Sequence, residues 1–118
     1  VGGYQVSDKG LYIDSGRGFT VSSVVKPDFV APAVNVQGVG VRDNYVTASG
    51  TSVAAAVTAG ACAQIMEWGI YRQENLALNS VEIGNLLIRG CDRSRELVYP
   101  NTAWGYGRLD AYQAILAL

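Results

Sequence analysis

Residues 49–60 read Ser-Gly-Thr-Ser-Val-Ala-Ala-Ala-Val-Thr-Ala-Gly and carry the clearest chemical signal in the sequence. Ser52 follows Gly50 and Thr51 and opens a run of small residues. A nucleophilic serine at the start of a helix needs such a turn, because its Oγ must reach the substrate. Free N–H groups of the first helical turn can then stabilise a developing oxyanion. We therefore predict that Ser52 is a nucleophile; an alanine-rich core helix without chemistry is the alternative.

The sequence contains no histidine. A serine nucleophile of the Ser-His-Asp type needs an imidazole to accept the proton from Oγ. We therefore expect residues 1–118 alone to be inactive in peptide hydrolysis. The base would come from outside this sequence.

Four segments resemble, in the same order, motifs of the subtilisin-like serine proteases (subtilases, peptidase family S8). Residues 49–60 resemble the nucleophile motif Gly-Thr-Ser-x-Ala-x-Pro, and residues 26–36 resemble the preceding Lys-Pro-Asp-x-x-Ala-Pro-Gly-x-x-Ile segment. Residues 15–20, Ser-Gly-Arg-Gly-Phe-Thr, are similar to the family's Ser-x-Arg-Gly-Pro-Thr loop. Residues 104–111, Trp-Gly-Tyr-Gly-Arg-Leu-Asp-Ala, are similar to the motif that begins the last helix of the catalytic domain.

The resemblance implies an α/β fold: the C-terminal part of a three-layer α/β/α subtilisin-like domain, with a parallel sheet and a buried central helix, incomplete on its own. Residues 1–118 would be the nucleophile segment of that catalytic domain. In the family the Asp, the His and the usual oxyanion Asn all precede the nucleophile. The implied function is therefore that of a serine endopeptidase whose other catalytic residues lie upstream.

The resemblance also implies roles for the residues around the nucleophile. Ser52 would attack the scissile carbonyl, and its backbone N–H would help to hold the oxyanion. Gly50 and Thr51 would shape the turn, while Ala54 and Ala55 would pack beneath it.

A narrower resemblance is to the clostridial Csp-type subtilases. It rests on the segments Glu67-Trp68-Gly69-Ile70, Leu87-Ile88-Arg89-Gly90 and Tyr99-Pro100-Asn101. Some members of that subgroup process a cortex hydrolase during spore germination, and others have lost triad residues and act as pseudoproteases. A catalytically inactive pseudoprotease or scaffold of the same fold is therefore the alternative function.

Two positions depart from the family pattern. Ala56 stands where the family has Pro, which stiffens the first turns of the nucleophile helix. Ala33 stands where the family has Gly, so a backbone with positive φ would be strained there. Neither change removes a catalytic group, and both bear on how well Ser52 is positioned.

The resemblance implies a polypeptide substrate and the N-terminal part of the same catalytic domain as partners. It identifies no cofactor, allows calcium in a full-length parent, and favours an extracytoplasmic, cell-envelope or spore-associated location. A third interpretation is self-association: an isolated chain would expose apolar surface and open strand edges, which favours a homo-oligomer.

Composition excludes several other classes. Hydrophobic residues make up 49% of the 118 residues and charged residues 16%, which is typical of a folded domain. The formal net charge is −1 and the basic residues are scattered, so we predict no nucleic-acid partner. Because no apolar run approaches the roughly 20 residues of a membrane helix, we also predict no membrane partner.

Turn residues and hydrophobic patterns predict the elements. We expect short strands at Val1–Tyr4 and Gly10–Ile13, followed by a loop at Asp14–Thr20. An extended segment should follow at Lys26–Ala33, and then two strands or a ribbon around Val34–Val41. The expected helices are a wholly buried one over Val53–Trp68, one capped by Asn79 or Ser80 and stopped by Gly90, and a terminal one with Asp110 in its first turn.

Cys62 and Cys91 have no metal-type spacing. Cys62 falls within the apolar helix, and we predict a buried free thiol. A disulfide between the two cysteines is the alternative.

Overall fold

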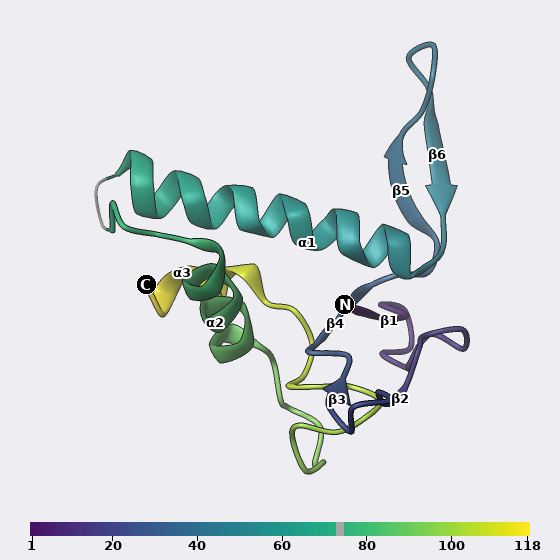
Figure 1. Cartoon of the computed structure of the whole chain (residues 1–118). Coiled ribbons are helices and arrows are strands. Elements are labelled where there is room, and N and C mark those ends of the chain that lie inside the picture. The colour runs from purple at the N-terminus through teal and green to yellow at the C-terminus, as the bar shows by residue number, and fades with distance from the viewer. Residues whose placement is uncertain (73–74) are drawn as a thin grey trace.

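A pair of parallel strands lies at the centre of the fold (Figure 1). In the computed structural model, which describes residues 1–72 and 75–118, β1 (Gly2–Tyr4) runs parallel to β4 (Val30–Pro32). Single-residue bridges continue this sheet from Val30 to Arg108 and from Arg108 to Asp92. The parallel sheet and the strand at Val1–Tyr4 are thus confirmed. The predicted extended segment Lys26–Ala33 is extended at β4 but bends at Asp28.

Two antiparallel ribbons accompany the sheet. One pairs β2 (Gly18–Phe19) with β3 (Val25–Lys26), and the other pairs β5 (Val36–Val39) with β6 (Tyr45–Ala48). The β5–β6 ribbon rises away from the rest of the molecule and leads directly into the first long helix (Figure 1).

Three strand predictions need correction. Gly10–Ile13 is not a strand, because β4 is the strand that pairs with β1 and only Leu11 bridges to Tyr4. The loop at Asp14–Thr20 ends in β2. The valines of Val34–Val41 supply only β5, and its partner β6 lies further along the chain.

Helix α1 (Thr51–Met66) continues into the π-helical turn η1 (Glu67–Tyr71), so the helix runs further in both directions than predicted. Only one face is buried, contrary to the expectation of a wholly buried helix. The buried residues of α1 recur at helical spacing: Ala54, Thr58, Ala61 and Ile65. The opposite face carries small residues and is exposed in this chain.

Helices α2 (Ser80–Gly90) and α3 (Ala111–Leu116) lie beneath α1 and close the core (Figure 1). The side chain of Asn79 caps α2 by accepting from the N–H groups of Val81 and Glu82, and Asp110 caps α3 from the position before its first turn. Gly90 is the last residue of α2 instead of the residue after it. The main cluster of buried core side chains is Phe29, Ala61, Ile65, Ile83, Leu86, Leu87, Cys91 and Ala114.

Taken together, α1 and η1 form 21 helical residues, Thr51–Tyr71, which by length and composition are enough to cross a membrane. The expectation that no segment reaches this length was therefore wrong. A core helix of a folded domain meets the same criterion, and the buried face of α1 packs on β4 and α3.

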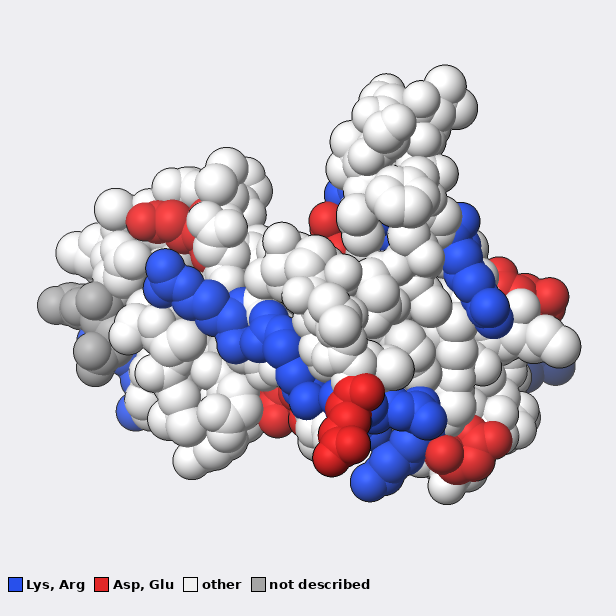
Figure 2. All heavy atoms as spheres, turned by 90° about the horizontal axis from the view of Figure 1, so that it is seen from below, with Lys and Arg blue, Asp and Glu red and all other residues white. Residues whose placement is uncertain are grey.

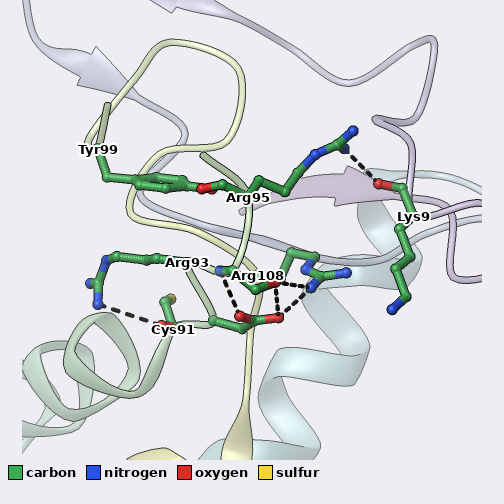
Figure 3. A network of polar contacts seen from close by, with 8 residues as sticks. Lys9, Cys91, Arg93, Arg95, Tyr99 and Arg108 are labelled. Atoms are coloured by element: carbon green, nitrogen blue, oxygen red, sulfur yellow. Dashed lines mark hydrogen bonds and ion pairs between the residues drawn. The ribbon is translucent and has the colours of Figure 1, made fainter. Parts of the chain in front are cut away.

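A polar network ties the C-terminal segment to the sheet (Figure 3). Arg108 forms an ion pair with Asp92 and donates to Ser94 Oγ at 2.9 Å, while the Ser94 N–H donates to Asp92 at 2.8 Å. Arg95 donates to the carbonyl of Lys9 at 2.8 Å, which connects residues far apart in the sequence. On the face drawn in Figure 2, basic side chains form a band with acidic side chains beside it.

This network makes stability depend on pH. Burial would raise the pKa of Asp92, but hydrogen bonds from Ser94 and the hydrogen bond and charge of Arg108 outweigh it and hold that pKa below its ordinary value. The resulting stabilisation is present above the unfolded-state pKa of about 3.9 and is lost as the pH falls through the folded-state pKa.

We expect Asp92→Asn to lower the free energy of unfolding by about 1 kcal/mol at pH 7, because it weakens a charged hydrogen-bond network. As the pH falls below about 4 and through the folded-state pKa of Asp92, the variant and the wild type should converge. Urea unfolding across this pH range measures both effects. The exposed hairpin residue Asp43 supplies the control Asp43→Asn, and equal effects of the two changes would contradict the prediction.

Candidate active site

Ser52 lies in the first turn of α1, and its side chain is exposed. Among the described residues, nothing hydrogen-bonds to its Oγ. The hydroxyl therefore faces outward from the start of the helix, as a nucleophile must. The structure places the predicted nucleophile where the sequence analysis expected it, at the mouth of the small-residue helix.

The turn before Ser52 depends on Gly50. This residue precedes α1 with φ 146°, a conformation that side-chain-bearing residues rarely adopt. A Cβ at Gly50 would also lie 3.2 Å from the Oγ of Ser52. Glycine therefore both permits the turn and leaves room for the hydroxyl.

Two backbone N–H groups of this turn have no acceptor among the described residues. The N–H groups of Val53 and Ala54 both donate to the carbonyl of Gly50, at 3.1 and 3.2 Å. Within residues 1–72 and 75–118, no acceptor takes the N–H of Thr51 or of Ser52. The Ser52 N–H can therefore donate to the oxyanion that forms on a carbonyl oxygen when Ser52 Oγ attacks the carbonyl carbon.

The turn is anchored to the segment after β4. The N–H of Gly50 donates to the carbonyl of Ala33 at 2.8 Å, and the N–H of Asn35 donates to Ser49 Oγ at 2.9 Å. The sequence analysis missed the roles of Ser49 and Asn35, because no spacing rule connects the two ends of a hairpin with the turn that follows it. Both contacts hold the start of α1 against the sheet.

The two departures from the family pattern have different consequences. Ala33 is fully buried and does not have a positive φ, so the expected backbone strain is absent. Gly3 provides the space, since a Cβ there would collide with that of Ala33. Ala56 is exposed on α1 and continues the helix without interruption.

The small residues predicted to pack beneath the turn divide into two kinds. Ala54 is fully buried and packs with Ala31 and Ala33. Ala55 is exposed, so in this chain it does not pack beneath Ser52. The helical spacing explains this, because adjacent residues point about 100° apart around an α-helix.

Neither cysteine is an alternative nucleophile. Burial raises the pKa of the Cys91 thiol to about 11, and its Sγ contacts the carbonyl of Leu87. Burial also raises the pKa of Cys62, which is half-buried beside the core. Both are free thiols that stay protonated near neutral pH. In the described part of the chain, no group of three metal-ligating side chains comes together.

The chain thus combines an α/β architecture with an exposed serine at the start of a small-residue helix. The profile described as the subtilase family (Peptidase_S8) matches residues 1–107. The chain therefore belongs to the subtilase family. No match was found among curated proteins.

Solved structures agree with this assignment. The CspB protease of Clostridium perfringens shares 35% identity with the chain at a TM-score of 0.90, over 98% of this chain and 25% of that one. The A-subunit of the AB5 toxin from E. coli shares 26% identity with the chain at a TM-score of 0.59. The match covers 76% of this chain and 26% of that one. The prenylagaramide maturation protease PagA matches at 19% identity and a TM-score of 0.73, over 99% of this chain and 41% of that one. At this identity the match shows the fold alone. The chain thus spans about a quarter of the CspB protease.

Proposed function

We propose that residues 1–118 are the nucleophile segment of a subtilisin-type serine endopeptidase, with Ser52 as its nucleophile. The observation that carries this proposal is the exposed Ser52, whose own N–H has no acceptor in the described part of the chain, at the start of α1. Membership of the subtilase family supports a protease, and the local geometry supports the role of this serine. A polypeptide is the substrate that follows from this chemistry.

The exposed face of α1 supports a partner that completes the catalytic domain. The exposed residues on that face of the helix are small: Ala55, Ala56, Ala59, Gly60 and Ala63. A row of such residues allows another backbone to approach closely. The N-terminal part of the same catalytic domain fits here, and it would also supply the His, the Asp and the side-chain oxyanion donor.

The residues present define one half of the reaction. Ser52 Oγ attacks the scissile carbonyl and transfers its proton to the His supplied from upstream. The N–H of Ser52 stabilises the oxyanion, and the helix N-terminus adds favourable electrostatic potential. Gly50 keeps the approach to the hydroxyl open.

Fluorophosphonate labelling tests the proposal, because this probe reacts with activated serines. We expect the longer protein that contains these residues to be labelled, and residues 1–118 alone to remain unlabelled for lack of a histidine. A folded longer protein without an inhibitory propeptide that resists labelling would instead indicate a pseudoprotease. Reading the upstream sequence for Asp-x-Gly and His-Gly-Thr motifs gives an independent check.

A further inference from the structure

An open pocket of about 430 Å³ lies beside the nucleophile turn and is lined by Thr51, the residue before Ser52. Its lining also includes Gly16, Arg17, Phe19 and Lys26. These residues belong to the loop before β2 and to the β2–β3 ribbon. The pocket therefore adjoins the proposed active site without including the nucleophile.

Among the described residues, the charged side chains that line this pocket are Arg17 and Lys26. Lys26 is neutralised, since its Nζ lies 2.8 Å from each carboxylate oxygen of Asp28. Arg17 is exposed, and no group among the described residues accepts a hydrogen bond from its guanidinium. No Asp or Glu lines the pocket. An anionic group entering it would meet the free guanidinium of Arg17 and the positive end of α1.

Gly16 is an exposed residue of the pocket lining and adds no side chain to it. A Cβ added at Gly16 would meet no atom within 4 Å, so neither packing nor a positive φ requires glycine at this position. The missing side chain leaves space that a ligand group can fill. The exposed ring of Phe19 gives the same space an apolar wall.

We infer that this pocket is a specificity subsite that accepts an acidic side chain, Asp or Glu, of the polypeptide substrate, held by Arg17. This inference rests on the proposed protease function and adds a substrate preference to it. The planar guanidinium suits a carboxylate, to which it donates two parallel hydrogen bonds. Because the site is open to solvent, the preference should be moderate and should weaken with salt.

Matched peptides in the longer protein test this subsite. Quenched fluorescent peptides, amidated at the C-terminus, would carry Glu or Gln at successive positions on either side of the cleaved bond. We expect one position at which Glu raises kcat/KM about fivefold over Gln, the upper range for an exposed ion pair. Anisotropy of the same peptides on the Ser52→Ala variant measures binding without cleavage.

Two variants assign any preference to the pocket. Arg17→Gln removes the positive charge from the pocket, and Gly16→Leu places a side chain in it. Each variant should bring the ratio of kcat/KM for the Glu peptide to kcat/KM for the Gln peptide close to one. Arg89→Gln and Gly84→Leu change an exposed arginine and an unpacked glycine on α2 and should leave the ratio unchanged. Equal treatment of Glu and Gln, or a preference that survives Arg17→Gln, would overturn the inference.

Two further results separate the explanations. The C-terminal carboxylate of a peptide is the other group that the pocket could bind, and peptides with a free C-terminus and no acidic side chain test it. If Arg17 favours only these peptides, the pocket does not bind an acidic side chain and the inference is overturned. A protein that is not labelled at Ser52 contradicts the proposed function. A labelled protein that ignores the Glu-to-Gln change contradicts only the subsite.

Discussion

Replacing Ser52 by alanine should abolish fluorophosphonate labelling of the longer protein and lower kcat for peptide hydrolysis by about 10⁶-fold. The loss is this large because the triad acts as a unit and cannot work without its nucleophile. The fold should not change, since the Ser52 side chain is exposed and has no hydrogen-bond partner in the described part of the chain. Labelling, peptide hydrolysis and circular dichroism measure the three effects.

Ser80→Ala is the matched control for this prediction. Ser80 is also an exposed serine in the first turn of a helix, α2, so it tests whether any such serine reacts. We expect normal labelling and hydrolysis from this variant. Persistent labelling of Ser52→Ala would mean that the reactive serine lies elsewhere in the longer protein.

The nucleophile turn is the part of the site that the sequence predicts well. Gly50, Thr51 and Ser52 are local in sequence, and the conformational freedom of glycine and the start of a helix are local properties. The contacts that anchor the turn are not local. Ser49 meets Asn35 only because the β5–β6 hairpin brings its two ends together, and no short window of sequence contains that pairing.

The same distinction explains which elements of the fold were missed. Asn79 and Asp110 cap helices through contacts within three residues, and both helices were predicted close to their observed bounds. Strand partners require non-local information, so the pairing of β1 with β4 was not predicted and β6 was overlooked. Tyr45, Val46 and Thr47 do have the β-branched and aromatic composition typical of a strand, so this signal was available.

The exposed face of α1 shows a third kind of limit. Its alanines and glycine predicted a helix buried on all sides, because the composition of a helix reflects every surface against which the helix packs. In residues 1–118 only the face with Ala54, Thr58, Ala61 and Ile65 is covered. The proposed N-terminal partner accounts for the remaining apolar character, and sequence composition alone does not tell which partner covers which face.

Gly105→Ala should be the most destabilising single methyl addition, with a loss of about 3 kcal/mol or more in the free energy of unfolding. Gly105 has φ 55°, and a Cβ there would collide with the carbonyl oxygens of both Pro27 and Asp28. Backbone atoms cannot move aside as a flexible side chain can. The N–H of Tyr106 donates to the same Asp28 carbonyl at 2.7 Å, so relief of the collision also breaks this hydrogen bond.

Thermal unfolding followed by tryptophan fluorescence measures this loss, and the buried Trp104 that precedes Gly105 contributes to the signal. Gly84→Ala is the control, since a Cβ at this position in α2 meets no atom within 4 Å. It should stabilise the protein by about 0.5 to 1 kcal/mol, because alanine favours the helix over glycine. Opposite signs for the same chemical change would show that the protein tolerates no side chain at position 105, where residues 105–107 approach residues 27–28. Equal shifts for both variants would contradict this.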